Sequence, residues 1–121
     1  TYHLINQDTV SKMKPGVILV NTARGPICDL DAMYSGLKSG QIGAAGLDVF
    51  DPEPPDVNHP LMLAWRGREA WLEGRFAATP HAAFFSPTSS KILREKALQT
   101  CLDYLKNNEL RNCVNAEHLV I

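Results

Sequence analysis

The segment Val17–Val20 is the clearest apolar run of the chain, and most of its residues are β-branched. A strand with one exposed face alternates apolar and polar residues, so an unbroken run indicates a strand buried on both faces, as in a parallel sheet between helices. Short apolar segments predict further strands at Ala44–Val49 and Phe76–Thr79. Tyr2–Ile5 is interpreted as the end of a strand that begins earlier.

Helices are expected in the intervals between these strands. Asp8 can cap a short helix that Pro15-Gly16 ends. Either Asp29 or Asp31 can cap a second helix, which ends at Gly40. The apolar residues of this second helix follow helical spacing and are Leu30, Met33, Tyr34 and Leu37.

A long helix is predicted over Pro87–Asn107, with Ser86 as its cap and proline in its first turn. Its apolar stripe consists of Leu98, Cys101, Leu102 and Leu105. The stretch Leu61–Gly74 is interpreted as a helical excursion in which Trp65 and Trp71 serve packing or an interface. The chain closes with apolar residues that we expect to dock as a tail: Val114, Leu119, Val120 and Ile121.

The alternation of strands and helices indicates an α/β fold, a Rossmann-like parallel sheet flanked by helices. In open sheets of this kind, ligands bind outside the carboxyl ends of the strands. Arg24 follows the first apolar strand, Asp48 and Glu53 lie at or after the second, and His81 follows the third. We therefore expect these side chains to meet at one edge of the sheet.

Length, net charge and cysteine content indicate the kinds of partner and the compartment to expect. The 121 residues suffice for one modest domain, and 12 basic against 13 acidic residues leave a net charge of -1. That balance gives no reason to expect nucleic acid or a membrane surface as a partner. Three widely spaced cysteines form no metal-ligand cluster and favour a reducing, cytoplasmic location. Because the chain begins at Thr1, we expect it to be a piece of a longer protein.

Each polar residue at the predicted edge has two possible interpretations, a catalytic or binding role and a structural or surface role. His81 is the leading acid/base candidate, although a histidine after a strand can equally satisfy backbone groups. Glu53 alone would be a solvated loop residue, but beside a histidine a carboxylate orients the ring and favours its charged form. Arg24 is either a surface arginine or a planar fork for a substrate carboxylate. Asp48 is either a structural cap or a ligand contact, because a buried carboxylate needs partners.

Three motifs in order carry a resemblance to a known family. They are Met13–Gly25, which contains Asn21-Thr22-Ala23-Arg24-Gly25, then Gly46–Pro54, and then Thr79-Pro80-His81. Together they resemble the D-isomer-specific 2-hydroxyacid dehydrogenases and cover most of the chain. A lone Thr-Pro-His would carry no such weight.

The resemblance implies a role for each matching position. Arg24 would bind the substrate carboxylate, His81 would exchange a proton with the carbonyl oxygen, and Glu53 would support His81. The substrate would be a small 2-keto or 2-hydroxy acid, and the cofactor NAD, with NADP not excluded. The residues implied as cofactor contacts are Thr22, Ala23, Arg24, Asp48, His81 and Ala83. No metal is implied.

The resemblance also implies an organisation. Residues 1–108 would be the C-terminal half of a NAD-binding domain whose Gly-rich loop lies outside this sequence, and residues 109–121 a tail returning toward the substrate domain. The full-length protein would be a homodimer, and this piece would not turn over alone. The segments His81–Phe84 and Leu110–Asn115 resemble the branch of the C-terminal-binding proteins and phosphoglycerate dehydrogenases. Two alternatives to an oxidoreductase therefore stay open: an NAD(H)-sensing, corepressor-like binding protein, and a truncated remnant without activity.

Overall fold

The structure is a computed structural model that describes residues 1–115, and the chain divides into two compact units, with the second beginning at Phe84. The first unit, Thr1–Ala83, contains the sheet and all the predicted catalytic residues. Its elements in order are α1 (Gln7–Ser11), β1 (Val17–Asn21), a 3-10 turn (Gly25–Ile27), α2 (Leu30–Ser39), β2 (Ile42–Leu47), α3 (Pro60–Arg66) and β3 (Phe76–Ala78). The second unit contains α4 (Pro87–Asn107).

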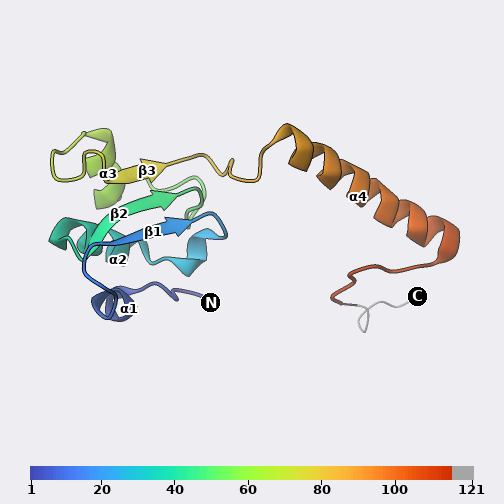
Figure 1. Ribbon diagram of the computed structural model, residues 1–121, viewed down its shortest axis with the longest axis horizontal. Coiled ribbons are helices and arrows are strands. Elements are labelled where there is room, and N and C mark those ends of the chain that lie inside the picture. Colours follow the sequence, from blue (N-terminus) through green and yellow to red (C-terminus); the bar gives the residue numbers. More distant parts are fainter. Residues whose placement is uncertain (116–121) are drawn as a thin grey trace. The chain divides into compact units, whose positions relative to one another are not determined.

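The three strands form one parallel sheet in the order β1-β2-β3, as Figure 1 shows. Asn21 at the end of β1 pairs with Leu47 at the end of β2, and Leu47 pairs with Ala78 at the end of β3. The carboxyl ends of all three strands therefore lie in register at the same edge. This arrangement confirms the predicted α/β fold class.

The hydrophobic core lies between the sheet and one helical layer. Helix α2 packs on β2, and α1 and α3 pack against α2. Burying each large apolar side chain here stabilises the fold by roughly 1.5–3 kcal/mol. The largest side chains with almost no exposure are Met33, Leu37, Ile42, Leu61, Val10 and Val49.

Within the first unit no helix covers the opposite face of the sheet, which corrects the prediction for β1. Ile18 and Val20 are 73% and 69% exposed, whereas Val17 and Leu19 contribute to the core. Successive side chains of a strand point to opposite faces, and the helices of this unit cover the face of Val17 and Leu19. In the first unit, helices therefore cover only one of the two faces that the unbroken apolar run predicts to be buried.

The N-terminal residues form a turn, so the predicted strand end at Tyr2–Ile5 is wrong. Within this segment only Ile5 makes a bridge, a single parallel one to Cys28. The amide of Leu4 donates to Thr1, and the carbonyl of Leu4 accepts from the Thr9 hydroxyl at 2.9 Å. The chain is therefore bent toward α1 before a strand can extend.

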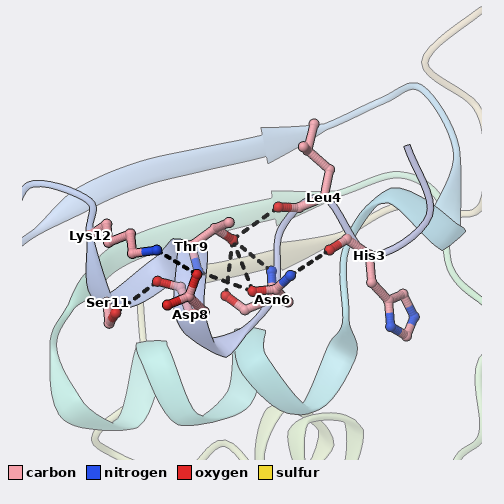
Figure 2. Close-up of polar contacts among 7 residues, drawn as sticks. All are labelled: His3, Leu4, Asn6, Asp8, Thr9, Ser11 and Lys12. Atoms are coloured by element: carbon pink, nitrogen blue, oxygen red, sulfur yellow. Dashed lines mark hydrogen bonds and ion pairs between the residues drawn. The ribbon is translucent and has the colours of Figure 1, made fainter.

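Helix α1 begins two residues earlier than predicted, because Asn6 and not Asp8 is its cap. Figure 2 shows the reciprocal contacts: the amide of Thr9 donates to Asn6 Oδ1 at 3.0 Å, and the amide of Asn6 donates to Thr9 Oγ1 at 2.9 Å. Such a capping box satisfies two amides that the first helical turn leaves without partners. Asp8 lies inside the first turn and pairs with Lys12 at 2.6 Å.

The ends of α2 agree with the prediction. Asp29 is the cap, accepting from the amide of Asp31 at 3.1 Å, and Gly40 ends the helix with a φ of 81°. The second strand is shifted from the predicted Ala44–Val49 to Ile42–Leu47. Asp48 directly follows β2: its amide still donates to the carbonyl of Asn21 at 3.0 Å, while its carboxylate accepts from the loop after β3.

The excursion after β2 is helical only at its start, over α3. His59 caps α3 through its ring, since Nδ1 accepts from the amide of Leu61 at 3.2 Å, and His59 Nε2 lies 3.0 Å from Asp31 Oδ1 on α2. Arg75 closes the excursion by donating 2.7–2.8 Å hydrogen bonds to four carbonyls, those of Gly43, Trp71, Leu37 and Ile42. His59 and Arg75 therefore hold the two ends of the excursion against α2 and β2.

Helix α4 has the predicted bounds and the predicted cap, with Ser86 accepting from the amide of Ser89 at 3.0 Å. Within the second unit its expected apolar stripe is not packed, with Leu98 at 66% and Leu105 at 78% exposure. Val114, expected to dock, is 97% exposed, and Leu119–Ile121 lie outside the described residues. The division at residues 108 and 109 stays a prediction.

Candidate active site

A histidine–carboxylate pair lies at the carboxyl edge of the sheet. His81 Nδ1 and Glu53 Oε2 are 2.8 Å apart, although the two residues are 28 positions apart in the sequence. Glu53 belongs to the loop after β2 and His81 to the loop after β3. Their side chains are 38% and 47% exposed, so the pair is accessible to a ligand. The structure therefore brings together two of the three predicted catalytic residues.

The backbone of His81 is held in an uncommon conformation. Its φ is 51°, in the left-handed region, and its amide donates to the carbonyl of Asp48 at 2.9 Å. A non-glycine residue in this region is strained by roughly 1–2 kcal/mol. The surrounding hydrogen bonds offset this strain and fix the direction in which the imidazole leaves the chain.

Asp48 supplies most of those hydrogen bonds. Its carboxylate accepts from the amide of Ala82 at 2.8 Å, from the amide of Ala83 at 2.9 Å and from the hydroxyl of Thr79. The Thr79 hydroxyl, together with the amides of Ala83 and Ala82, lowers the pKa of Asp48. The residue is 4% exposed. The structure therefore shows Asp48 as a structural cap for the His81 loop, and its role as a ligand contact stays a prediction.

Glu53 is held by a second contact besides His81. Its Oε1 accepts from the amide of Phe50 at 2.9 Å. The hydrogen bond with His81 is the main cause that lowers the pKa of Glu53, and the Phe50 amide adds to it. An ionised carboxylate only accepts hydrogen bonds, so His81 Nδ1 carries the shared proton. The other ring nitrogen, Nε2, is the atom that remains for a substrate.

Arg24 lies in the turn after β1, next to the loop that carries Glu53. Gly25 is buried against Phe50, and a Cβ added to Gly25 would lie 1.8 Å from the carbonyl oxygen of Phe50. Asn21 fixes the turn from within, since its amide group donates to the carbonyl of Arg24 at 2.9 Å. Arg24 is exposed, and its Nη1 donates to the carbonyl of Ala23 at 2.7 Å. The third predicted catalytic residue is thus on the same edge, without direct contact to the pair.

Most of the predicted cofactor contacts are accessible. Five of the six positions are exposed at the carboxyl edge, namely Thr22, Ala23, Arg24, His81 and Ala83. Three of their amides already donate within the protein: that of Ala23 to Asn21 Oδ1 at 3.0 Å, that of His81 to the carbonyl of Asp48 and that of Ala83 to the Asp48 carboxylate. Asp48, the sixth position, is buried. These contacts stay predictions.

The sequence analysis missed two supporting residues, Asn21 and Thr79. Asn21 is 5% exposed and joins the turn after β1 to β2, since its carbonyl accepts from the amide of Asp48. Thr79 binds the carboxylate of Asp48. Each is a polar residue at the end of an otherwise apolar segment, and this pattern could have indicated that the side chain has a supporting role at the edge.

Residues 1–115 contain neither a group of potential metal ligands nor a membrane-spanning helix. There, no group of three or more histidine, cysteine or acidic side chains could hold a metal ion. Over the same range, none of the helices has both the length and the apolar character for crossing a membrane.

Glu53→Gln should change the acid sensitivity of the protein. A carboxyl group whose pKa is lowered by folding stabilises the native state above its ordinary pKa, and this contribution is lost as pH falls through the lowered value. The wild type should therefore unfold at a higher temperature than the variant at neutral pH, and the difference should shrink in acid. Thermal unfolding between neutral and acidic pH measures this. Asp51→Asn removes a charge from the same loop as the control, and a difference for Glu53→Gln that does not vary with pH would refute the coupling.

An α/β layer with a histidine–carboxylate pair at the edge where such sheets bind ligands is typical of a nucleotide-binding domain of the Rossmann type. Residues 1–83 match the family profile described as D-isomer specific 2-hydroxyacid dehydrogenase, NAD binding domain. The chain therefore belongs to the D-isomer-specific 2-hydroxyacid dehydrogenase family and is part of its NAD-binding portion.

Similar proteins agree with this assignment. The chain is 40% identical over 106 residues to a putative 2-hydroxyacid dehydrogenase of Haemophilus influenzae, covering 88% of the chain and 32% of that protein. It is 36% identical over 121 residues to a glyoxylate reductase of Thermofilum pendens, covering 100% of the chain and 33% of the relative. The chain thus spans about a third of the length of these curated relatives.

Solved structures show the same likeness. A glyoxylate reductase from Paecilomyes thermophila has a TM-score of 0.76 and 30% identity, covering 91% of this chain and 30% of that one. A D-lactate dehydrogenase from Aquifex aeolicus, complexed with NAD and lactic acid, has a TM-score of 0.68 and 30% identity, covering 87% of this chain and 33% of that one.

These relatives correct the predicted branch. They are named as reductases and dehydrogenases, whereas the motifs at His81–Phe84 and Leu110–Asn115 had suggested C-terminal-binding proteins or phosphoglycerate dehydrogenases. Motifs as short as four to six residues can be shared by several branches of one family. None of the relatives compared above is a corepressor, so the corepressor-like alternative is not supported by them.

Proposed function

We propose that the whole protein is an NAD-dependent oxidoreductase that interconverts a D-2-hydroxy acid and its 2-keto acid. The 2.8 Å pair of His81 and Glu53 is the observation that carries this proposal. It places an oriented imidazole at the edge where Arg24 also lies. The names of the relatives, which include glyoxylate reductases and D-lactate dehydrogenases, support the same reaction class.

Arg24 binds the carboxylate of the substrate in this proposal. A guanidinium can donate two parallel hydrogen bonds to a carboxylate, which fixes the orientation of the acid as well as its position. The turn that carries Arg24 is held by Asn21 and packed on Phe50, so the guanidinium starts from a fixed base. The carbonyl group next to the bound carboxylate then points toward the loop of His81.

His81 moves the proton. When bound, the nicotinamide cofactor supplies or takes up the hydride at C2 of the substrate. During reduction Nε2 of His81 gives its proton to the carbonyl oxygen, and during oxidation the same nitrogen removes the proton of the hydroxyl. Glu53 stabilises the charged imidazole through Nδ1, while its contact with Phe50 keeps the carboxylate in place.

The exposed residues of the edge hold the nicotinamide end of the cofactor. We assign this role to Thr22, Ala23, Arg24, His81 and Ala83, and assign to Asp48 an indirect contribution through the turn it fixes. We propose NAD as the cofactor. Structures of relatives are described with NAD in one case and NADPH in another, so both cofactors belong in the test.

The proposal also includes the compartment and the oligomeric state. The cysteines Cys28, Cys101 and Cys113 are all free thiols, which supports the cytoplasm as the compartment. The homodimer rests on the family resemblance.

The function is tested with the full-length protein and a panel of 2-keto acids, with NADH and NADPH supplied separately. We expect consumption of the reduced cofactor with glyoxylate, pyruvate or hydroxypyruvate, a D-configured product from pyruvate, and a preference for NADH. An absence of turnover with every 2-keto acid, or an L-configured product, would contradict the proposal.

A further inference from the structure

A polar residue stands at the carboxyl end of each strand of the sheet. Asn21 is the last residue of β1, and Asp48 and Thr79 directly follow β2 and β3. The amide of Asp48 donates to the main-chain carbonyl of Asn21 at 3.0 Å, and the hydroxyl of Thr79 donates to the Asp48 carboxylate. Asn21 and Asp48 are 5% and 4% exposed. These three residues, here called the edge row, therefore form a continuous series of hydrogen bonds from β1 to β3.

One end of the edge row holds the turn of Arg24. Asn21 Oδ1 accepts from the amide of Ala23 at 3.0 Å, and Asn21 Nδ2 donates to the carbonyl of Arg24 at 2.9 Å. Asn21 Nδ2 also lies 3.5 Å from Cys28 Sγ, so both polar atoms of the buried side chain have partners. These contacts fix the main chain before and after the Cα of Arg24, and with it the point from which the guanidinium extends.

The other end of the edge row holds the loop of His81. The hydroxyl of Thr79 and, at 2.8 Å, the amide of Ala82 both donate to Asp48 Oδ1. The amide of Ala83 donates to Oδ2 of the same carboxylate at 2.9 Å. Asp48 thus binds the two residues that follow His81, whose left-handed φ of 51° persists only where the surroundings hold it. Thr79 therefore acts on His81 through the Asp48 carboxylate.

We propose that Asn21 and Thr79 are positioning residues with separate effects on the reaction: Asn21 places the guanidinium that binds the substrate, and Thr79 places the imidazole that transfers the proton. This inference rests on the proposed function. The effects are separable because Asn21 meets Asp48 through its main-chain carbonyl, which every substitution retains. Within residues 1–115, no hydrogen bond joins the Thr79 side chain to the Arg24 turn. A change at Asn21 therefore alters substrate binding, and a change at Thr79 alters the chemical step.

Thr79→Val tests the effect on the chemical step, because valine keeps the shape of threonine and lacks the hydroxyl. In the full-length protein it should lower kcat for reduction of a 2-keto acid about 10-fold, since a small misplacement of a catalytic group slows the reaction. KM for the acid should stay within about 2-fold. Thr79→Ser keeps a hydroxyl and should restore most of kcat. Starting from His81→Asn, Thr79→Val should have no further effect on kcat, because the imidazole that Thr79 places is absent.

Asn21→Ala tests the effect on substrate binding. It should raise KM for the 2-keto acid, and the Kd of oxamate measured by calorimetry with NADH present, about 10-fold, and leave kcat within about 3-fold. Starting from Arg24→Ala, the same change should raise neither constant further. Asn6→Ala is the matched control, because Asn6 also accepts an amide, that of Thr9 at 3.0 Å, and donates to a carbonyl, that of His3 at 2.9 Å. It removes the same kind of contacts from the start of α1 and should leave all three constants unchanged.

The outcomes separate this inference from the proposed function. Wild-type turnover of a 2-keto acid, combined with equal changes of kcat and KM in Asn21→Ala and Thr79→Val, would overturn the separate effects alone. A rise of KM in Asn6→Ala as large as in Asn21→Ala would overturn them too, because it would reflect a general loss of stability. An absence of turnover with every 2-keto acid in the wild type would overturn both proposals. If Asn21→Ala does not fold, Asn21→Ser decides the point through the same constants, because a serine hydroxyl can still accept the amide of Ala23.

Discussion

Replacing His81 by alanine is expected to lower kcat of the full-length protein by about 10²–10⁴-fold, the usual contribution of a positioned acid/base group. The imidazole held at 2.8 Å from Glu53 is the proposed source and acceptor of the proton. Steady-state reduction of a 2-keto acid measures the loss. KM should change less than kcat, because in the proposed mechanism Arg24 rather than His81 binds the carboxylate.

The backbone of His81 requires a second variant beside alanine. Its φ of 51° is tolerated better by asparagine than by alanine, so His81→Asn removes the imidazole with less disturbance of the loop. Both variants should lose kcat to a similar extent. His3→Ala, in the N-terminal turn where His3 stacks on Tyr2, serves as the control and should retain activity. A loss in His81→Asn of only a few fold would show that the imidazole is not the acid/base group.

Gly25→Ala is expected to have the largest effect on stability. An alanine Cβ at this position would lie 1.8 Å from the Phe50 carbonyl oxygen and 2.0 Å from its carbon, and both are backbone atoms. The turn with Arg24 must then move away from the loop with Glu53. We expect a destabilisation of about 3 kcal/mol, at the upper end for overpacking, together with a raised KM for the 2-keto acid.

A matched glycine isolates this effect. At Gly46 on β2 an added Cβ would meet its nearest atom, of Val20, at 3.9 Å, which is ordinary contact. Gly46→Ala should therefore leave the unfolding temperature and KM close to those of the wild type. Equal behaviour of the two alanine variants in thermal unfolding would contradict the close packing of the Arg24 turn on Phe50.

Local sequence signals predicted the elements that depend on neighbouring residues. Ser86 with Pro87 marked the start of α4, and Asp29, one of two predicted caps, and Gly40 marked the ends of α2, because capping and left-handed turns involve residues within a few positions. The cap of α1 was misassigned since Asp8, Asn6 and Thr9 all offer side-chain oxygens. Only the reciprocal bond between Asn6 and Thr9 distinguishes them.

The catalytic edge could be predicted for a different reason, namely topology. Parallel strands place their carboxyl ends together, so Glu53 and His81 were expected to meet without any local signal. The role of Asp48 could not be read in the same way. Its partners Thr79, Ala82 and Ala83 lie 31 to 35 positions away, and only the folded loop aligns their donors with the carboxylate. The open face at Ile18 and Val20 likewise depends on which elements cover the sheet, and a strand's own residues do not specify that.

A structure of the full-length protein with nicotinamide cofactor and the substrate analogue oxamate tests the central claim most directly. The account predicts that the Arg24 guanidinium donates to the oxamate carboxylate and that His81 Nε2 lies about 2.7–3.2 Å from the neighbouring oxygen, with Glu53 still on Nδ1. Oxamate bound away from Arg24, or an imidazole turned from the analogue, would contradict it.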